Sequence, residues 1–155
     1  MTQTSVNLDF IGRQYPQTPA YQVGREKIAE FARVIGSTNP ACFSLEAARG
    51  LGYPDVVAPT TFAVVVAQAA EAQYITDPEA RVDFSRVVHA DERFTYTRPI
   101  FASDELVTVV HVDKIVERAG LAMITTRCEI GALTQDGVEP VVSVVSTLAV
   151  RGEDH

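Results

Sequence analysis

The stretch Thr60-Thr-Phe-Ala-Val-Val-Val-Ala-Gln-Ala-Ala-Glu-Ala-Gln-Tyr-Ile75 decides the fold of this chain. It is almost continuously apolar and is long enough for about four helical turns. Val64–Val66 have strand propensity, but the alanine-rich length and the preceding Pro59 favour a helix. Because apolar residues occur all around its surface, we predict a helix that other elements bury.

Everything after Asp77-Pro78 has the pattern of strands separated by short turns. Arg98-Pro99 ends the first strand, and Asp136-Gly137 is a strong signal for a tight hairpin between the last two. Because the links are short, we expect an antiparallel meander of four strands. These strands are predicted at residues 87–97, 105–116, 121–133 and 141–150.

Alternation along the first of these strands predicts an apolar and a polar face. The apolar face would hold Val88, Ala90, Phe94 and Tyr96, and the polar face His89, Asp91, Arg93 and Thr95. His89 would then lie on the same face as Asp91. We expect this pair to be solvated or to lie at an interface between chains.

A sheet with one apolar face needs a cover, and the 60–75 helix is the only segment apolar enough to provide it. A long antiparallel sheet curled around one central helix is the hot-dog fold, of the α+β class. We therefore predict a single domain over residues 1–155, with an irregular arm at about residues 1–20 lying on the surface. Since the sequence has no internal repeat, a second unit that covers the exposed strand edge would come from another chain.

Three short elements are predicted between the arm and the central helix. Tyr21–Val23 suits a short strand, and the helical spacing of apolar residues begins at Gly24 and ends at Gly36. Ser44 is expected to cap a second, shorter helix, which Gly50 stops.

Composition narrows the classes of partner. The chain has 155 residues and a formal net charge of -7. This acidic balance argues against nucleic acid, whose binding relies on Lys and Arg neutralising phosphates. A small anionic ligand, such as an acyl thioester on a phosphopantetheine arm, could still bind at a local basic spot. Arg25, Lys27 and Arg86 are candidates for that spot, and scattered surface bases explain them equally well.

Cys42 and Cys128 are too few for a disulfide framework or a zinc cluster, so we predict two reduced thiols and no metal site. The sequence at residues 1–5 has neither a basic head nor an apolar run, and no segment approaches the roughly 20 apolar residues of a membrane span. By default we expect a cytoplasmic protein with no cofactor and no membrane contact.

A loop from Val34 to Phe43, Val-Ile-Gly-Ser-Thr-Asn-Pro-Ala-Cys-Phe, separates the two helices that precede the central one. With this loop and the element order, the chain resembles the MaoC-like hydratase and dehydratase family of hot-dog proteins from Tyr21 to about Arg151. The pieces that carry the resemblance are Gly36-Ser37-Thr38-Asn39-Pro40, Ala58-Pro59-Thr60, and Phe94 through Arg98-Pro99 to Asp104 and Leu106.

Within that family the chain is most similar to the non-catalytic subunit of the heterodimeric (3R)-hydroxyacyl-ACP dehydratases and to related uncharacterised actinobacterial proteins. Tyr21-Gln-Val-Gly-Arg-Glu-Lys-Ile and Ser85-Arg-Val-Val-His-Ala-Asp-Glu carry this narrower likeness. The resemblance implies a role in fatty-acid metabolism, with an acyl-CoA or acyl-ACP thioester as ligand. It leaves the length of the acyl chain and the choice between CoA and ACP open.

The family's catalytic loop reads Gly, Asp, any residue, Asn, Pro, any residue, His. Its Asp and His move the protons when water is added to, or removed from, the acyl thioester, which requires groups that titrate near neutral pH. Here Ser37 stands at the Asp position and Cys42 at the His position, while Asn39 and Pro40 match the family. We therefore expect a loop that keeps its shape and has no intact catalytic pair.

Other residues could still contact a substrate. In the resembling hydratases the start of the central helix, here Pro59, Thr60 and Thr61, helps to receive the thioester carbonyl. Thr60 could equally be a simple helix cap. His89 could help to shape a partner's active site, and Asn39 completes the set of candidate substrate-binding residues.

Three functions follow as hypotheses. The first is a dehydratase or hydratase subunit that binds the acyl chain while a partner chain supplies Asp and His. The second is a non-catalytic homodimer that binds acyl thioesters. The third is a hot-dog thioesterase, for which Glu71 is the only carboxylate on the central helix, late in the helix and far from its N-terminus.

Overall fold

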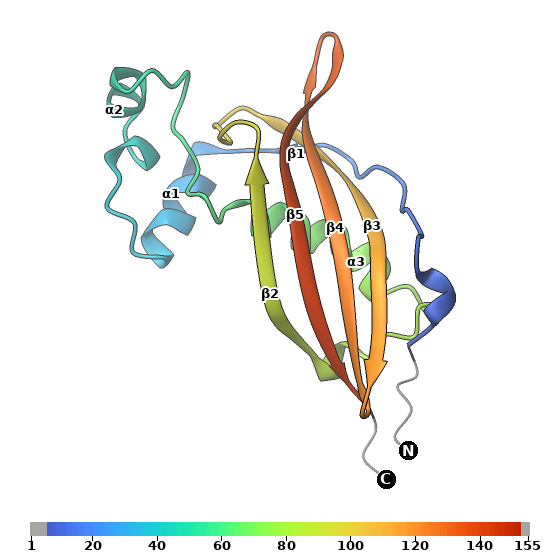
Figure 1. Ribbon diagram of the computed structural model, residues 1–155. Coiled ribbons are helices and arrows are strands. Elements are labelled where there is room, and N and C mark those ends of the chain that lie inside the picture. The colour runs from blue at the N-terminus through green and yellow to red at the C-terminus, as the bar shows by residue number, and fades with distance from the viewer. Residues whose placement is uncertain (1–5, 153–155) are drawn as a thin grey trace.

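The apolar stretch forms helix α3, Ala63–Ile75, in the computed structural model of the chain, which describes residues 6–152 (Figure 1). The helix begins three residues later than Thr60, because Pro59–Phe62 form a turn in which the Phe62 amide donates to the Pro59 carbonyl. α3 lies across one face of the sheet and packs against its three longest strands. One face of the helix is buried, formed by Ala63, Val66, Ala67, Ala70, Glu71 and Tyr74.

Five antiparallel strands form one curled sheet in the order β1-β3-β4-β5-β2, which confirms the predicted hot-dog fold. The strands are β1 Tyr21–Gln22, β2 Val87–Tyr96, β3 Glu105–Arg118, β4 Leu121–Thr134 and β5 Gly137–Arg151. The four predicted long strands are therefore present, and β5 begins four residues earlier than expected.

The predicted four-strand meander is wrong for its first strand. β3, β4 and β5 follow one another through hairpins, but β2 pairs with β5 on the far side of the sheet and not with β3. The edge of β3 is already occupied by β1, where Tyr21 pairs with Leu106. The chain between Tyr96 and Glu105 therefore crosses the end of the sheet, and β2 becomes an edge strand.

A β-bulge in β2 corrects the predicted faces of this strand. His89 is opposite Leu148 of β5, and Asp91 is opposite the next residue, Thr147, so Ala90 is an extra residue in the ladder. Since neighbours in a strand alternate in direction, this residue reverses the faces on one side of the bulge. His89 thus shares the inner face with Phe94 and Tyr96, while Asp91 lies on the outer face, and the predicted pairing of His89 with Asp91 is wrong.

The N-terminal arm lies on the surface along the outer edge of β3. The amides of Gly12, Tyr15 and Thr18 donate to carbonyls of β3, at 2.7, 2.9 and 2.9 Å. Phe10 of the short helix η1, Leu8–Phe10, is buried in the core. One edge of the sheet is therefore covered, whereas β2 has no strand on its outer side among residues 6–152.

The segment before α3 contains the elements predicted for it. Helix α1 is Arg25–Val34, and helix α2 is Leu45–Gly50, with the Ser44 hydroxyl accepting from the Ala47 amide as its cap. Short 3-10 turns occur at η2, Pro40–Cys42, and η3, Phe84–Arg86. Figure 1 shows α1 and α2 together beyond the β2 edge of the sheet.

Cys42 and Cys128 are both buried and free, which confirms the predicted thiols. No helix within residues 6–152 has the length and apolar character needed to cross a membrane. The prediction made for residues 1–5 lies outside the described residues.

Candidate functional site

The loop after α1 is shaped by backbone caps. Gly36 has a φ of 73°, a left-handed conformation that favours glycine. Its amide donates to the Arg33 carbonyl, and the Ser37 amide donates to the Ala32 carbonyl, which is the Schellman arrangement of a helix end. The Asn39 side chain then accepts from the Ala41 amide at 3.1 Å and caps η2. Asn39 is thus placed in a structural role within this chain.

Ser37 and Cys42 contact each other within this loop. The Cys42 thiol is 2% exposed, and burial raises its pKa, while a hydrogen bond from Ser37 opposes that rise. The Ser37 oxygen also accepts from the Asn39 amide at 3.3 Å. A thiol with a raised pKa is protonated at neutral pH, and a serine hydroxyl is no base without a neighbouring one. The two residues therefore hold no group that would exchange a proton near pH 7.

The start of α3 lies next to this loop. The Val57 amide donates to the Ala41 carbonyl at 3.0 Å, and the rings of Phe31 and Phe62 pack edge to face at 5.5 Å between centroids. The Thr60 carbonyl accepts from the Tyr96 hydroxyl at 2.6 Å, in a hollow of about 270 Å³ between the segment that precedes α3 and the end of β2. Burial raises the pKa of Tyr96 to about 12, so this hydroxyl keeps its proton.

The N-cap residue of α3 is Phe62, which makes no side-chain cap hydrogen bond, so Thr60 is not the cap of this helix. Thr60 and Thr61 are exposed, and Pro59 is half-buried. These residues and the loop form one region at the end of β2. A role of this region in receiving a thioester carbonyl stays a prediction.

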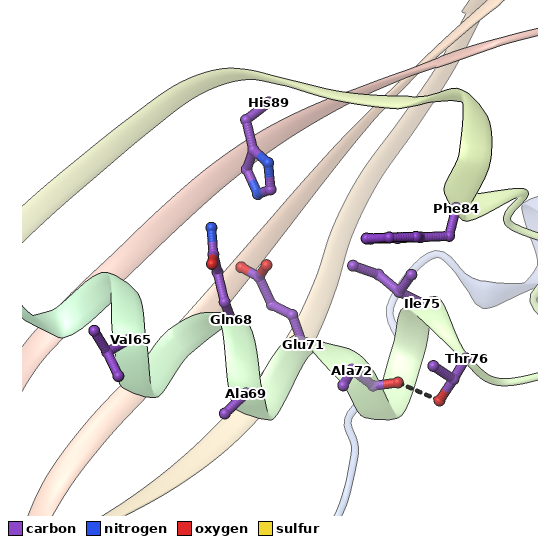
Figure 2. Close-up of a pocket in the computed structure, with 9 residues that line it drawn as sticks. All are labelled: Val65, Gln68, Ala69, Glu71, Ala72, Ile75, Thr76, Phe84 and His89. Carbon is purple, nitrogen blue, oxygen red and sulfur yellow. Dashed lines mark hydrogen bonds between the residues drawn. The ribbon is translucent and has the colours of Figure 1, made fainter.

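His89 does not belong to that region. It lies seven residues before Tyr96 on β2, which corresponds to roughly 23 Å along a strand. Its side chain instead points at the middle of α3, toward Gln68 and Glu71 (Figure 2). The structure therefore divides the predicted site residues into two groups: the loop with the start of α3, and His89 with the later part of α3.

A cavity of about 600 Å³ separates α3 from β2 and holds the second group. Gln68, Glu71 and His89 are gathered at one part of it, and Phe84 lies over Ile75 at another (Figure 2). Its remaining wall is formed by Val65, Ala69, Ala72 and Thr76. An apolar cavity with a few convergent polar groups is the usual form of a small-molecule site.

Behind the cavity wall, a buried polar cluster joins α3 to three strands. Glu71 has no exposed surface, and its Oε1 accepts from Ser146 at 2.8 Å and Thr126 at 3.1 Å. The Ser146 oxygen is also 2.9 Å from Oε1 of Glu92, whose carboxyl lies 4.0 Å from the His89 ring nitrogen. Burial raises the pKa of Glu92, and the negative charge of Glu71 adds to this rise.

Sequence reasoning found Glu71 but missed its neighbours Glu92, Thr126 and Ser146. Thr126 lies between the inward-facing residues Ile124 and Cys128, and its exposed surface is 0%. A hydroxyl at an inward position of an apolar strand is a usable signal for a buried polar contact, because such groups need partners. Among the described residues, no group of three or more His, Cys, Asp or Glu side chains could hold a metal ion.

Residues 9–143 of the chain match the family described as "FAS1-like, dehydratase domain region". A UPF0336 protein of Saccharopolyspora erythraea is 52% identical over 143 residues, which cover 92% of this chain and 90% of that protein. A UPF0336 protein of Leifsonia xyli subsp. xyli is 46% identical over 149 residues, covering 96% and 98% of the two chains.

Solved structures give a consistent result. A chain of the C-terminally truncated HadBC (3R-hydroxyacyl-ACP dehydratase) complex from Mycobacterium tuberculosis is 34% identical, with a TM-score of 0.79. The match covers 91% of this chain and 97% of that chain. A MaoC-like dehydratase is 32% identical with a TM-score of 0.83, over 94% of this chain and 43% of that one.

Proposed function

The chain belongs to the "FAS1-like, dehydratase domain region" family and is related to UPF0336 proteins. We propose that it is a subunit of a (3R)-3-hydroxyacyl-thioester dehydratase or enoyl hydratase of fatty-acid metabolism. It binds the acyl group of a CoA or ACP thioester and provides half of an assembled sheet. A partner hot-dog chain supplies the catalytic Asp and His. Family membership accounts for the dehydratase-type fold, and the features below support the finer assignment.

The chemistry of the loop is the observation that carries this proposal. Gly36, Asn39 and Pro40 keep the turn that would present two catalytic side chains. Ser37 and Cys42 occupy the two positions, and the thiol is buried with a raised pKa. General acid–base catalysis contributes about 10² to 10⁴ in rate, so a chain without the pair needs a second source of it.

The surface of the chain supports a partner at β2 and α3. β2 is the open edge of the sheet within the described residues, and exposed Phe84 and Val88 lie at its beginning, 71% and 58% exposed. α3 is apolar on all sides, yet Ala69 and Ala72 are uncovered. Open strand edges and apolar patches are typical of surfaces that another chain covers.

The similar structures add support. The HadBC (3R-hydroxyacyl-ACP dehydratase) structure is described as a complex, and one of its chains is 34% identical to this one over nearly its full length. The assignment of a heterodimeric partner to this chain rests on that likeness and on the altered loop. A homodimer that binds acyl thioesters without turnover is the second candidate, since the same loop would explain its lack of chemistry.

A thioesterase is less well supported. Glu71, the one carboxylate on α3, has no exposed surface and accepts two hydroxyl hydrogen bonds. A carboxylate that attacks a thioester or activates water must reach the reacting carbon, and this one faces the sheet.

Co-expression tests the proposal. The chain is produced with a hot-dog protein from a neighbouring gene whose loop reads Gly-Asp-x-Asn-Pro-x-His, and the purified material is assayed for hydration of crotonyl thioester. We expect a 1:1 complex with activity, no activity from this chain alone, and loss of activity when the Asp of the partner is changed to Asn.

Two outcomes would contradict the proposal. One is a robust rate from this chain alone that Cys42→Ala abolishes. The other is failure of every neighbouring hot-dog protein to form a complex. Tight thioester binding without turnover in the presence of an active partner would select the second candidate instead.

A further inference from the structure

One hydroxyl group lies between two carboxyl groups on the inner side of the sheet. The Ser146 hydroxyl of β5 is 2.8 Å from Oε1 of Glu71 on α3 and 2.9 Å from Oε1 of Glu92 on β2. Both distances are those of O–H···O hydrogen bonds. Ser146 and Glu71 have no exposed surface, and Oε2 of each carboxyl is buried without a partner within residues 6–152. The edge strand, its neighbour and the central helix therefore meet at one buried oxygen atom.

The hydrogen atoms available in this cluster require a proton on one of the two carboxyls. A hydroxyl has one hydrogen and an ionised carboxylate has none, so Ser146 can donate to only one of them. The second contact is a hydrogen bond only if the other carboxyl is protonated and donates to the Ser146 oxygen. Thr126 does not supply that hydrogen, because it donates to Oε1 of Glu71 at 3.1 Å. Whichever way the Ser146 hydroxyl turns, Glu71 and Glu92 together hold one proton in this arrangement.

The charged groups around Glu92 act on the same proton. Burial raises the pKa of Glu92, and the negative charges of Glu71 and Asp91 add to this rise. The Ser146 hydroxyl opposes the rise only while its hydrogen points at Glu92. The His89 ring, 4.0 Å away on β2, opposes it when the ring is charged. Burial and two like charges thus favour the protonated carboxyl that the hydrogen bonds require.

The group that faces the pair from β4 is neutral. The Cys128 thiol lies 3.8 Å from Oε1 of Glu71, and burial raises its pKa, so it keeps its proton. Exchange of the shared proton with water has a route through Glu92, whose side chain is 20% exposed. The pair is therefore buried enough to hold a proton and accessible enough to release it.

We infer that Glu71 and Glu92 share one proton through Ser146, and that this proton holds the edge strand β2 against the central helix α3. When the proton passes to water at higher pH, two negative charges within about 6 Å of each other remain and repel. The contact between β2 and α3 then weakens, at the open edge of the sheet within the described residues. This pH-sensitive contact belongs to the folded chain alone and does not rest on the proposed function.

Carboxyl carbon signals of the purified chain measure the proton. The glutamate side chains are labelled with ¹³C at the carboxyl carbon, and spectra are recorded from pH 4 to pH 9. An ordinary glutamate is ionised at pH 6, so we expect signals displaced toward the protonated position by a total of one proton. Glu92→Gln should remove this displacement. Glu129→Gln is the matched control and should keep it, because Glu129 also accepts from a serine of β5, Ser143 at 3.0 Å, but is exposed and paired with Arg127.

A second variant distinguishes a shared proton from a single perturbed carboxyl. In Glu71→Gln the second carboxylate is gone and Ser146 is free to donate to Glu92. The titration of Glu92 should therefore move to lower pH by about one unit or more. If this variant does not fold, the proton count of the wild type and of Glu92→Gln still decides the inference.

Amide hydrogen exchange measures the contact between β2 and α3. After correction for the intrinsic rate, protection of the β2 amides should fall about tenfold from pH 6 to pH 9 in the wild type and less than about twofold in Glu92→Gln. Amides of β3 should change in neither protein.

Three results would overturn the inference: full ionisation of every glutamate at pH 6, an unchanged titration of Glu92 in Glu71→Gln, or protection of β2 that does not depend on pH. None of these measurements involves a partner or turnover. Failure of the proposed function therefore leaves their outcome unchanged.

Discussion

The loop at residues 36–43 and the cavity between α3 and β2 each have a feature that the other lacks. The loop keeps the Gly, Asn and Pro of the catalytic pattern that it resembles, with Asn39 capping η2 and Gly36 ending α1, but Ser37 and Cys42 cannot exchange protons near pH 7. The cavity has ionisable side chains, Glu71 and His89, in a place that the loop motif does not indicate. In this chain the sequence motif thus indicates the shape of the backbone more directly than it indicates the presence of ionisable side chains.

The largest expected effect comes from restoring the chemistry of the loop. Ser37→Asp with Cys42→His should give homomeric hydration of crotonyl thioester about 10²-fold above the wild-type chain, because the turn already holds the two positions close together. Absorbance of the enoyl thioester measures the rate. Ser37→Asn with Cys42→Gln is the control of similar size and should stay at background. No gain in the first variant would mean that the loop lacks catalytic geometry as well as catalytic groups.

The second-largest effect should be a difference in the free energy of unfolding between variants of the two regions. Glu71→Ala leaves the buried Thr126 hydroxyl without an acceptor, removes one of the two carboxyl contacts of Ser146 and opens a void, so we expect the free energy of unfolding to fall by about 2–4 kcal/mol. Ser37→Ala removes the contacts of one half-buried hydroxyl with the Asn39 amide and the Cys42 thiol and should cost about 0.5 kcal/mol. Urea unfolding of both variants measures the difference. Equal losses would contradict the view that the polar cluster, and not the loop, holds the core together.

The pH dependence of the free energy of unfolding should come from Glu92, which lies near the cavity and not in the loop. Burial raises the pKa of Glu92 above its ordinary value of 4.5. Below that value the carboxyl is protonated in both the folded and the unfolded chain. As the pH rises further the unfolded chain loses the proton first, so stability falls until the folded-state pKa is passed.

Glu92→Gln should remove this loss. The variant should therefore gain stability relative to the wild type as the pH is raised from 4.5 toward 7. The charges of Glu71, His89 and Asp91 act on Glu92 in the wild type, and these residues are present in both proteins, so the difference between the two proteins isolates Glu92. A difference that stays constant across the range would show that Glu92 ionises normally in the fold.

The smallest effect concerns the Cys42 thiol. It is 2% exposed and its pKa is raised, so a thiol reagent at pH 7.5 should label neither cysteine of the native chain during the minutes in which an exposed thiol reacts. Phe43→Cys, at the neighbouring exposed position, is the control and should react at once. Mass spectrometry counts the labelled thiols. Fast labelling of Cys42 would indicate an activated thiol and would support a catalytic role for the loop.

Local sequence signals were sufficient for most of the fold. Periodicity and capping residues predicted α1, α2 and α3 closely, because Gly36 and Ser44 act within one helical turn. Alternating apolar residues predicted the long strands. The position of β2 beside β5 was missed, since it depends on which sheet edge is already occupied, and no short segment carries that information.

The candidate site was less predictable for the same reason. One extra residue, Ala90, turns His89 from the outer to the inner face, and nothing in the local sequence marks it as a bulge. The cluster of Glu71 with Ser146 and Thr126 joins residues 55 and 75 positions apart. Each hydroxyl looks ordinary within its own strand, and its partner becomes visible only when helix and sheet are placed together.

The N-terminal arm has a consequence for how many chains can assemble. A sheet with two free edges could add a neighbour at each, and repeated addition would give open-ended fibres. Here β1 and the backbone bonds from Gly12, Tyr15 and Thr18 occupy the β3 edge, so within residues 6–152 the free edge of the sheet is at β2. Association through that edge ends when two chains have met. A short irregular segment thus limits polymerisation, and trimming it would expose a second edge for aggregation.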